Sequence, residues 1–192
     1  MEELALHVLD IAQNSIAAGA RRIRIRVRES RREDLVTIEV SDEGRGMEQA
    51  VRERATDPFF TTRQTRRVGL GLPLLEQAAQ AAGGALGIES LPGAGTLVRA
   101  AFRYSHVDRQ PLGDMAGTLL TLIVGHPEIE FEYVHQTDER ELVFRTQEIQ
   151  AELEGRPLSS PQAIAAVRKR LAGMPGKESQ AHGTGNYRED HP

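Results

Sequence analysis

Asp42-Glu43-Gly44-Arg45-Gly46 places one acidic side chain and two glycines directly after a predicted strand. In the preceding residues 36–40, apolar side chains alternate with polar ones, as a half-buried strand requires. A carboxylate at the end of such a strand, here Asp42, can accept a hydrogen bond from the exocyclic amine of an adenine. The glycines have no Cβ, so the backbone can adopt unusual φ values and approach a flat ring. An acidic glycine turn between two elements would look the same, and both interpretations stay open at this point.

Residues 2–18 predict a helix, because apolar residues recur along one broad face. Asp10 and Asn14 are four positions apart and therefore share a face of this helix. Short polar side chains in an apolar helix are a local conflict of the kind that marks a site. The Asn14 amide oxygen suits Mg²⁺, and Asp10 could orient or deprotonate a water molecule. The alternative is that both side chains face solvent at the edge of the apolar band.

A basic segment with glycines at its end lies further along the chain. It begins with Asp57-Pro58-Phe59-Phe60-Thr61-Thr62-Arg63 and ends with Gly69-Leu70-Gly71. Pro58 interrupts any helix, and we expect the two phenylalanines to anchor a loop by burying their rings. The glycine pair opens a helix predicted over 72–82, whose free N–H groups can bind an anion together with Arg63, Arg66 and Arg67. A solvated basic loop before an ordinary helix start is the alternative, and the spacing of a Walker loop is absent.

Two strands are predicted after that helix, over 86–90 and 97–104. Gly83-Gly84 stops the helix, and Pro92-Gly93 makes a turn between the strands. Thr96 enters the second strand, where its hydroxyl could form a hydrogen bond near an adenine beside Asp42. A β-branched residue that simply suits a strand is the alternative for Thr96.

In this order, the motifs resemble the GHKL nucleotide-binding domain of DNA gyrase, heat-shock chaperones, histidine kinases and the mismatch-repair MutL ATPases. The resemblance covers residues 1–104 and rests on Asp10…Asn14, Asp42-x-Gly44-x-Gly46, Asp57 to Thr62, Gly69-x-Gly71 and Gly93-x-Gly95-Thr96. The phenylalanine segment and Gly69-Leu70-Gly71-Leu72 are most similar to histidine kinases and anti-sigma-factor serine kinases. The segment from Asn14 to Ala20 is closer to the MutL pattern.

The resemblance implies that these residues bind ATP and Mg²⁺. It implies that Asn14 holds Mg²⁺, that Asp42 binds the adenine amino group with support from Thr96, and that Gly44 and Gly46 shape the purine pocket. A mobile lid is implied from Thr61 to Gly69, with nucleotide contacts from Phe60, Thr61, Thr62, Arg63, Gly69, Leu70 and Gly71. Asp10 stands where the ATPase members have a glutamate general base, and Arg67 stands where a kinase lid has a glycine. Because aspartate is one methylene shorter, the resemblance implies binding more strongly than hydrolysis.

Residues 22–28 alternate arginine with isoleucine or valine, which predicts a strand. A period of two puts Arg22, Arg24, Arg26 and Arg28 on the face opposite the core. We expect a solvated outer face with cross-strand partners such as Glu39. The alternative is a docking surface for an acidic protein partner.

The chain has 192 residues, no cysteine and a formal net charge of −4. The charge argues against general nucleic-acid binding, and the lack of cysteine excludes disulfides and iron–sulfur ligation. No stretch reaches the roughly 18–20 apolar residues of a membrane span, and the acidic start does not predict a signal peptide. We therefore expect a cytoplasmic protein that contacts a protein partner, a regulator or phosphoacceptor, rather than nucleic acid or a membrane.

Three parts are predicted along the chain: an ATP-binding domain over 1–104, a small α/β appendage over 105–172 and a disordered tail over 173–192. In the appendage we expect helices at 112–124, 146–154 and 161–172, and strands at 129–134 and 141–144. In the tail, Gly, Pro, Lys, Ser and His dominate, so little can be buried.

The order of the elements favours a two-layer α/β sandwich, with a mixed, largely antiparallel sheet and helices on one face. Three function hypotheses follow. The first is a Mg-dependent, ATP-binding regulatory protein of the histidine-kinase-like group, whose ordered lid forms a partner surface, with or without transfer of the γ-phosphate to the partner. The others are a MutL-like ATPase clamp and a non-catalytic ATP-sensing module.

Overall fold

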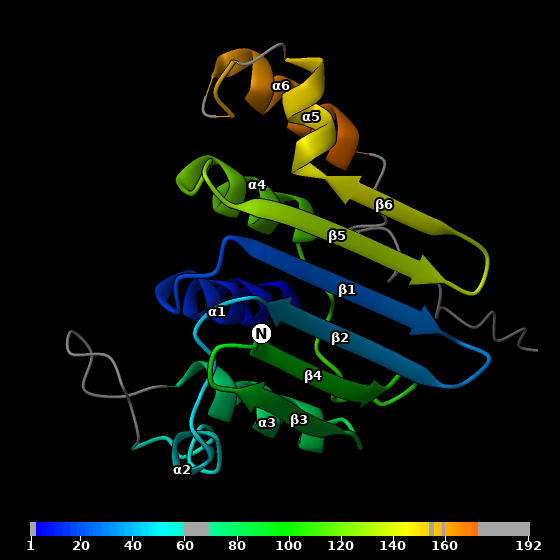
Figure 1. The fold of residues 1–192 in the computed structure, drawn as a ribbon. Helices are drawn as coiled ribbons and strands as arrows, with labels where there is room; N and C mark the ends of the chain where they lie inside the picture. Colours follow the sequence, from blue (N-terminus) through cyan, green and yellow to red (C-terminus); the bar gives the residue numbers. More distant parts are fainter. Residues whose placement is uncertain (1–2, 60–69, 154–155, 159, 173–192) are drawn as a thin grey trace, which may run out of the picture.

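The computed structural model describes residues 3–59, 70–153, 156–158 and 160–172, and shows a six-stranded sheet with helices packed on one of its faces (Figure 1). The predicted two-layer α/β sandwich is confirmed. The elements in chain order are α1 (Leu4–Ala17), β1 (Arg22–Ser30), β2 (Leu35–Asp42), α2 (Gln49–Arg52), α3 (Gly71–Ala81), β3 (Ala85–Leu91), β4 (Gly95–Arg103), α4 (Met115–Gly125), β5 (Glu130–Thr137), β6 (Glu141–Arg145), α5 (Thr146–Glu152) and α6 (Pro161–Leu171).

The strand order is β3-β4-β2-β1-β5-β6. Neighbouring strands are antiparallel except β1 and β5, which pair in parallel from Arg22 opposite Glu130 to Glu29 opposite Thr137. The strands after residue 104 therefore continue the sheet on its β1 side. The division into a domain and an appendage at that residue stays a prediction, and the tail predicted over 173–192 lies outside the described residues.

The core lies between the sheet and helices α1, α3 and α4 (Figure 1). Alternate side chains of the central strands point into it, because successive residues of a strand face opposite sides of the sheet. These inward residues include Ile23, Ile25 and Val27 of β1 and Val36, Ile38 and Val40 of β2, which pack with Leu4, Val8 and Ile11 of α1, Leu75 of α3 and Leu119 of α4.

Helix α4 begins three residues later than predicted, at Met115 instead of Leu112. The Asp114 side chain caps it by accepting a hydrogen bond from the Gly117 N–H at 2.9 Å. The carbonyl of Leu112 instead accepts a hydrogen bond from the Ala5 N–H, which ties this connection to the first turn of α1. None of the helices in the described ranges is long and apolar enough to cross a membrane.

The arginines of β1 lie on the outer face of the sheet, as their alternation predicts, while Ile23, Ile25 and Val27 are buried. The predicted cross-strand partner of this stripe is confirmed, because Glu39 lies directly opposite Arg26. Glu39 also lies opposite Arg99 of β4 on its other side, and it forms its ion pair with Arg99, at 2.6 Å. A central strand has two neighbours, so the identity of a cross-strand partner depends on the whole strand order and not on the stripe alone.

Candidate functional site

Asp42 lies at the end of β2, half-buried against α1. The Ser15 hydroxyl donates a hydrogen bond to Asp42 Oδ2 at 2.5 Å, and the Gly44 N–H donates one to Oδ1 at 2.9 Å. Each carboxylate oxygen has two lone pairs, so both can accept one more donor. The helix and the turn thus fix the orientation of a carboxylate that retains the capacity to bind an exocyclic amine.

The two glycines after Asp42 allow the turn to pack closely on its own chain. A Cβ on Gly44 would lie 2.9 Å from the Cβ of Ala18, and the neighbouring Arg45 N–H donates to the Ala18 carbonyl at 3.0 Å. Gly46 has a φ of +67°, and its Cβ would lie 1.9 Å from the carbonyl oxygen of Leu91. These contacts join the ends of α1 and β3 to the turn, and a purine pocket at Gly44 and Gly46 stays a prediction.

Thr96 lies directly opposite Asp42 in the pairing of β2 with β4. Its hydroxyl is bonded to the Ser90 hydroxyl at 2.9 Å, and Ser90 also donates to the Gly95 carbonyl at 2.9 Å. Ser90 has one hydroxyl proton, so Thr96 must be the donor in their shared bond. The Thr96 oxygen therefore keeps lone pairs beside Asp42, and support of the adenine by this residue stays a prediction.

The N-terminus of α3 lies beside Asp10. A Cβ on Gly71 would come within 3.3 Å of the Asp10 Cβ and 3.6 Å of its Oδ2. Asp10 is half-buried, and Asn14 is exposed one turn further along α1. Within the described residues, no side chain caps α3, so the N–H groups of its first turn can bind an anion. The fold thus brings three predicted site residues, Asp10, Asn14 and Gly71, to one side of α1.

Several predicted site residues fall outside the described ranges, namely Phe60, Thr61, Thr62, Arg63 and Gly69, and their contacts stay predictions. Leu70 precedes α3 and is half-exposed. The expected burial of the first phenylalanine is wrong, because Phe59 is 88% exposed. The preceding residues 53–58 contain no large apolar side chain on which its ring could pack.

The described residues contain no group of three or more His, Cys, Asp or Glu that could hold a metal ion. A magnesium site built from a nucleotide does not require one, since Mg²⁺ keeps several waters and is bound through one or two protein ligands and substrate phosphates. Asn14 is an exposed residue, and a side-chain amide oxygen has the chemistry of such a single ligand. The residues present therefore fit a magnesium ion that arrives with the phosphates.

Sequence reasoning missed two serines that organise the site. Ser15 is 3% exposed and follows Leu4, Val8 and Ile11 on the buried face of α1, at spacings of four, three and four. A polar residue on that apolar stripe is a pattern from which Ser15 could have been predicted as a site residue. Ser90 is 6% exposed and accepts a hydrogen bond from the Met47 N–H, 43 positions away, at 2.9 Å. No local pattern indicates that contact.

Comparison with known proteins shows that part of the chain matches the model of a protein family. A model described as "Histidine kinase-, DNA gyrase B-, and HSP90-like ATPase" matches residues 2–106, more than half of the chain. An Anti-sigma F factor of Caldanaerobacter subterraneus subsp. tengcongensis is 45% identical over 65 residues, which are 33% of this chain and 41% of that protein. The Sensor protein kinase FleS of Pseudomonas aeruginosa is 40% identical over 89 residues, which are 46% of this chain and 22% of FleS. The chain thus spans less than half the length of these relatives.

Among solved structures, the Aquifex aeolicus MutL ATPase domain complexed with ADP aligns with a TM-score of 0.50 and 14% identity, over 88% of this chain and 88% of that one. At this identity the likeness shows the fold alone. The covered share is larger than residues 2–106, so the shared fold extends beyond the segment that the family model matches.

Proposed function

Because the chain belongs to the Histidine kinase-, DNA gyrase B-, and HSP90-like ATPase family, we propose that it binds ATP with Mg²⁺ and regulates a protein partner according to its nucleotide state. The observation that carries the proposal is the Asp42 carboxylate, which Ser15 and Gly44 orient at the end of β2 within the matched segment. The similarity to an Anti-sigma F factor and to a sensor protein kinase supports a regulatory role with a protein partner.

Each part of the site has a separate task in this proposal. Asp42 accepts the exocyclic amine of the adenine, with Thr96 opposite it in the next strand. The first turn of α3 offers backbone N–H groups to the phosphates. Asn14 holds the magnesium ion, which when bound offsets the charge of the phosphate oxygens. Asp10, which lies beside Gly71 and one helical turn from Asn14, has the task of orienting a water molecule or an attacking hydroxyl.

Replacing Asn14 by alanine should remove the magnesium dependence of nucleotide binding. Calorimetric titration of the purified chain with ADP and with a non-hydrolysable ATP analogue should give micromolar affinity that rises with Mg²⁺. In Asn14→Ala, the affinity measured with Mg²⁺ should fall to the value that the wild type shows without it. Asn14 is exposed on α1, so the substitution should leave the melting temperature within about 2 °C of the wild type.

The control is Gln13→Ala, which truncates an amide side chain at the neighbouring helix position. It should retain the full effect of Mg²⁺. Absence of binding of either nucleotide to the wild type would refute the proposal, whereas unchanged magnesium dependence in Asn14→Ala would refute only the metal assignment.

Transfer of the γ-phosphate to the partner is the second candidate function, favoured by the 40% identity to a sensor protein kinase and by Asp10 beside the N-terminus of α3. If Asp10 is a general base, Asp10→Asn should lower the rate of ADP formation from ATP, by transfer to the partner or by hydrolysis, about a hundredfold and change ADP affinity less than twofold. Asp10→Glu, which restores the residue of the ATPase members, should keep turnover. A wild type that binds ATP without turnover or transfer would identify a non-catalytic ATP-sensing module.

A further inference from the structure

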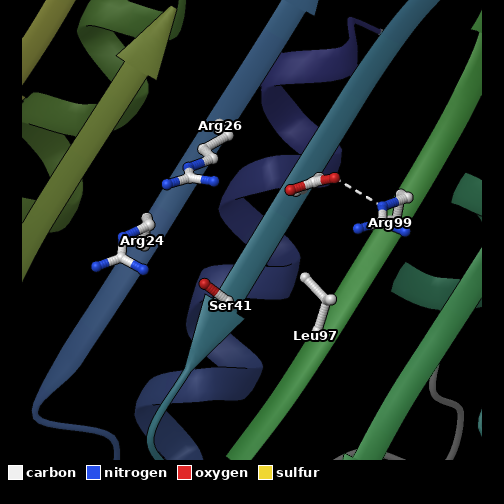
Figure 2. Close-up of a pocket in the computed structure, with 6 residues that line it drawn as sticks. Arg24, Arg26, Ser41, Leu97 and Arg99 are labelled. Carbon is white, nitrogen blue, oxygen red and sulfur yellow. Dashed lines mark hydrogen bonds and ion pairs between the residues drawn. The ribbon is translucent and has the colours of Figure 1, made fainter.

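The outer face of the sheet carries a shallow hollow on the side of the strands away from α1. The hollow measures about 240 Å³ and is lined by Arg24, Arg26, Glu39, Ser41, Leu97 and Arg99. Figure 2 shows these side chains on β1, β2 and β4, with α1 behind the strands. No helix of the described part of the chain covers this face (Figure 1). The hollow is therefore separate from the nucleotide site, which lies at the strand ends and along α1.

The lining residues of the hollow lie side by side because of the pairing register of β1, β2 and β4. Arg24 lies opposite Ser41, and Ser41 lies opposite Leu97. The next outward row along the strands is Arg26, Glu39 and Arg99. Ser41 and Leu97 bear no charge, so three guanidinium groups and one carboxylate surround an uncharged floor. The local charge is positive although the whole chain has a formal net charge of −4.

The arginines around the hollow differ in how they are paired. Arg99 is bonded to Glu39 at 2.6 Å, and Arg24 is bonded to Glu132 of β5 at 2.8 Å. The exposed side chain of Arg26 makes neither an ion pair nor a hydrogen bond within the described ranges. Its guanidinium group thus retains its donors for a ligand, whereas those of its two neighbours are already partly used.

We propose that this hollow binds a carboxylate side chain of an acidic segment of a partner protein, with Arg26 as the main contact. A guanidinium group presents paired donors that match the two oxygens of a carboxylate. Arg24 and Arg99 flank it and add long-range attraction, and the Ser41 hydroxyl lies on the floor as a further donor. Glu39 and Glu132 reduce the local positive charge, which suits a singly charged carboxylate better than a nucleic-acid backbone.

The surface does not depend on the nucleotide proposal, because it uses different residues on the opposite face of β2. It is tested with a fluorescein-labelled hexaglutamate peptide, whose anisotropy reports binding to the full chain at low salt. A hexaglutamine peptide should not bind. Arg26→Ala should weaken hexaglutamate binding about fivefold, the upper range for one partly exposed ion pair. Charge reversal in Arg26→Glu should weaken it more than tenfold.

Arg28→Ala is the matched control, because Arg28 lies on the same strand and face but outside the hollow, where it pairs with Glu33. It should bind the peptide as the wild type does, and all variants should keep the wild-type melting temperature. No binding of hexaglutamate, or an equal loss in Arg26→Ala and Arg28→Ala, would overturn the proposal. Displacement of the peptide by inorganic phosphate at lower concentration than by free glutamate would also overturn it, since the hollow would then prefer phosphate.

Discussion

Replacing Asp42 by asparagine is expected to weaken the binding of ADP and ATP by roughly ten- to a hundredfold. A hydrogen bond to a charged acceptor contributes about 1.5–3 kcal/mol, and a factor of ten in affinity corresponds to about 1.4 kcal/mol. The substitution should preserve the local fold. The asparagine oxygen can still accept from the Gly44 N–H, and its amide can donate to the Ser15 hydroxyl. Calorimetric titration with ADP in the presence of Mg²⁺ measures the change.

Glu43→Gln is the control for loss of one negative charge at the same turn. The Glu43 side chain is 64% exposed and pairs with Arg22, so its neutralisation should leave ADP affinity unchanged. Inorganic triphosphate, which has no adenine, should bind Asp42→Asn and the wild type equally. If Asp42→Asn binds ADP as tightly as the wild type, the adenine assignment is wrong.

The elements of the fold could be predicted because their signals are local. The apolar face of α1 and the arginine–isoleucine alternation of β1 lie within single segments, and helices and strands have different periods. The parallel pairing of β5 with β1 could not be predicted in this way. Ile23 and its partner Phe131 are 108 positions apart, and nothing in either strand specifies its neighbour. The continuation of the sheet beyond residue 104 therefore depends on long-range contacts, which local sequence patterns do not indicate.

In the candidate site, too, local features could be predicted from the sequence and long-range contacts could not. The motif indicated that Asp42 ends a strand, and the fold places it there. What orients its carboxylate is Ser15, which reaches it across 27 positions. The error at Phe59 has a related cause, because residue type predicts a preference for burial but not whether a surface exists to bury the ring.

Gly95→Ala is expected to destabilise the fold strongly, by about 3 kcal/mol or more, because it combines two costs. Gly95 has a φ of +86°, which disfavours any residue with a Cβ by about 1–2 kcal/mol. Its Cβ would also lie 1.9 Å from the Asp42 carbonyl oxygen, so the end of β2 would have to move. The midpoint of urea unfolding should fall accordingly. ADP binding should weaken as well, since the displaced backbone carries Asp42, the carboxylate proposed to bind the adenine.

Gly93→Ala separates these two costs. Gly93 lies in the turn that precedes Gly95 and has a φ of +76°, but a Cβ there would meet no atom within 4 Å. Its substitution should therefore cost only about 1 kcal/mol and leave ADP affinity at the wild-type value. The difference between the two unfolding midpoints then measures the close approach of the β3–β4 turn to Asp42. Equal midpoints in the two variants would show that this approach adds no cost beyond the positive φ, and that the turn does not hold the carboxylate in place.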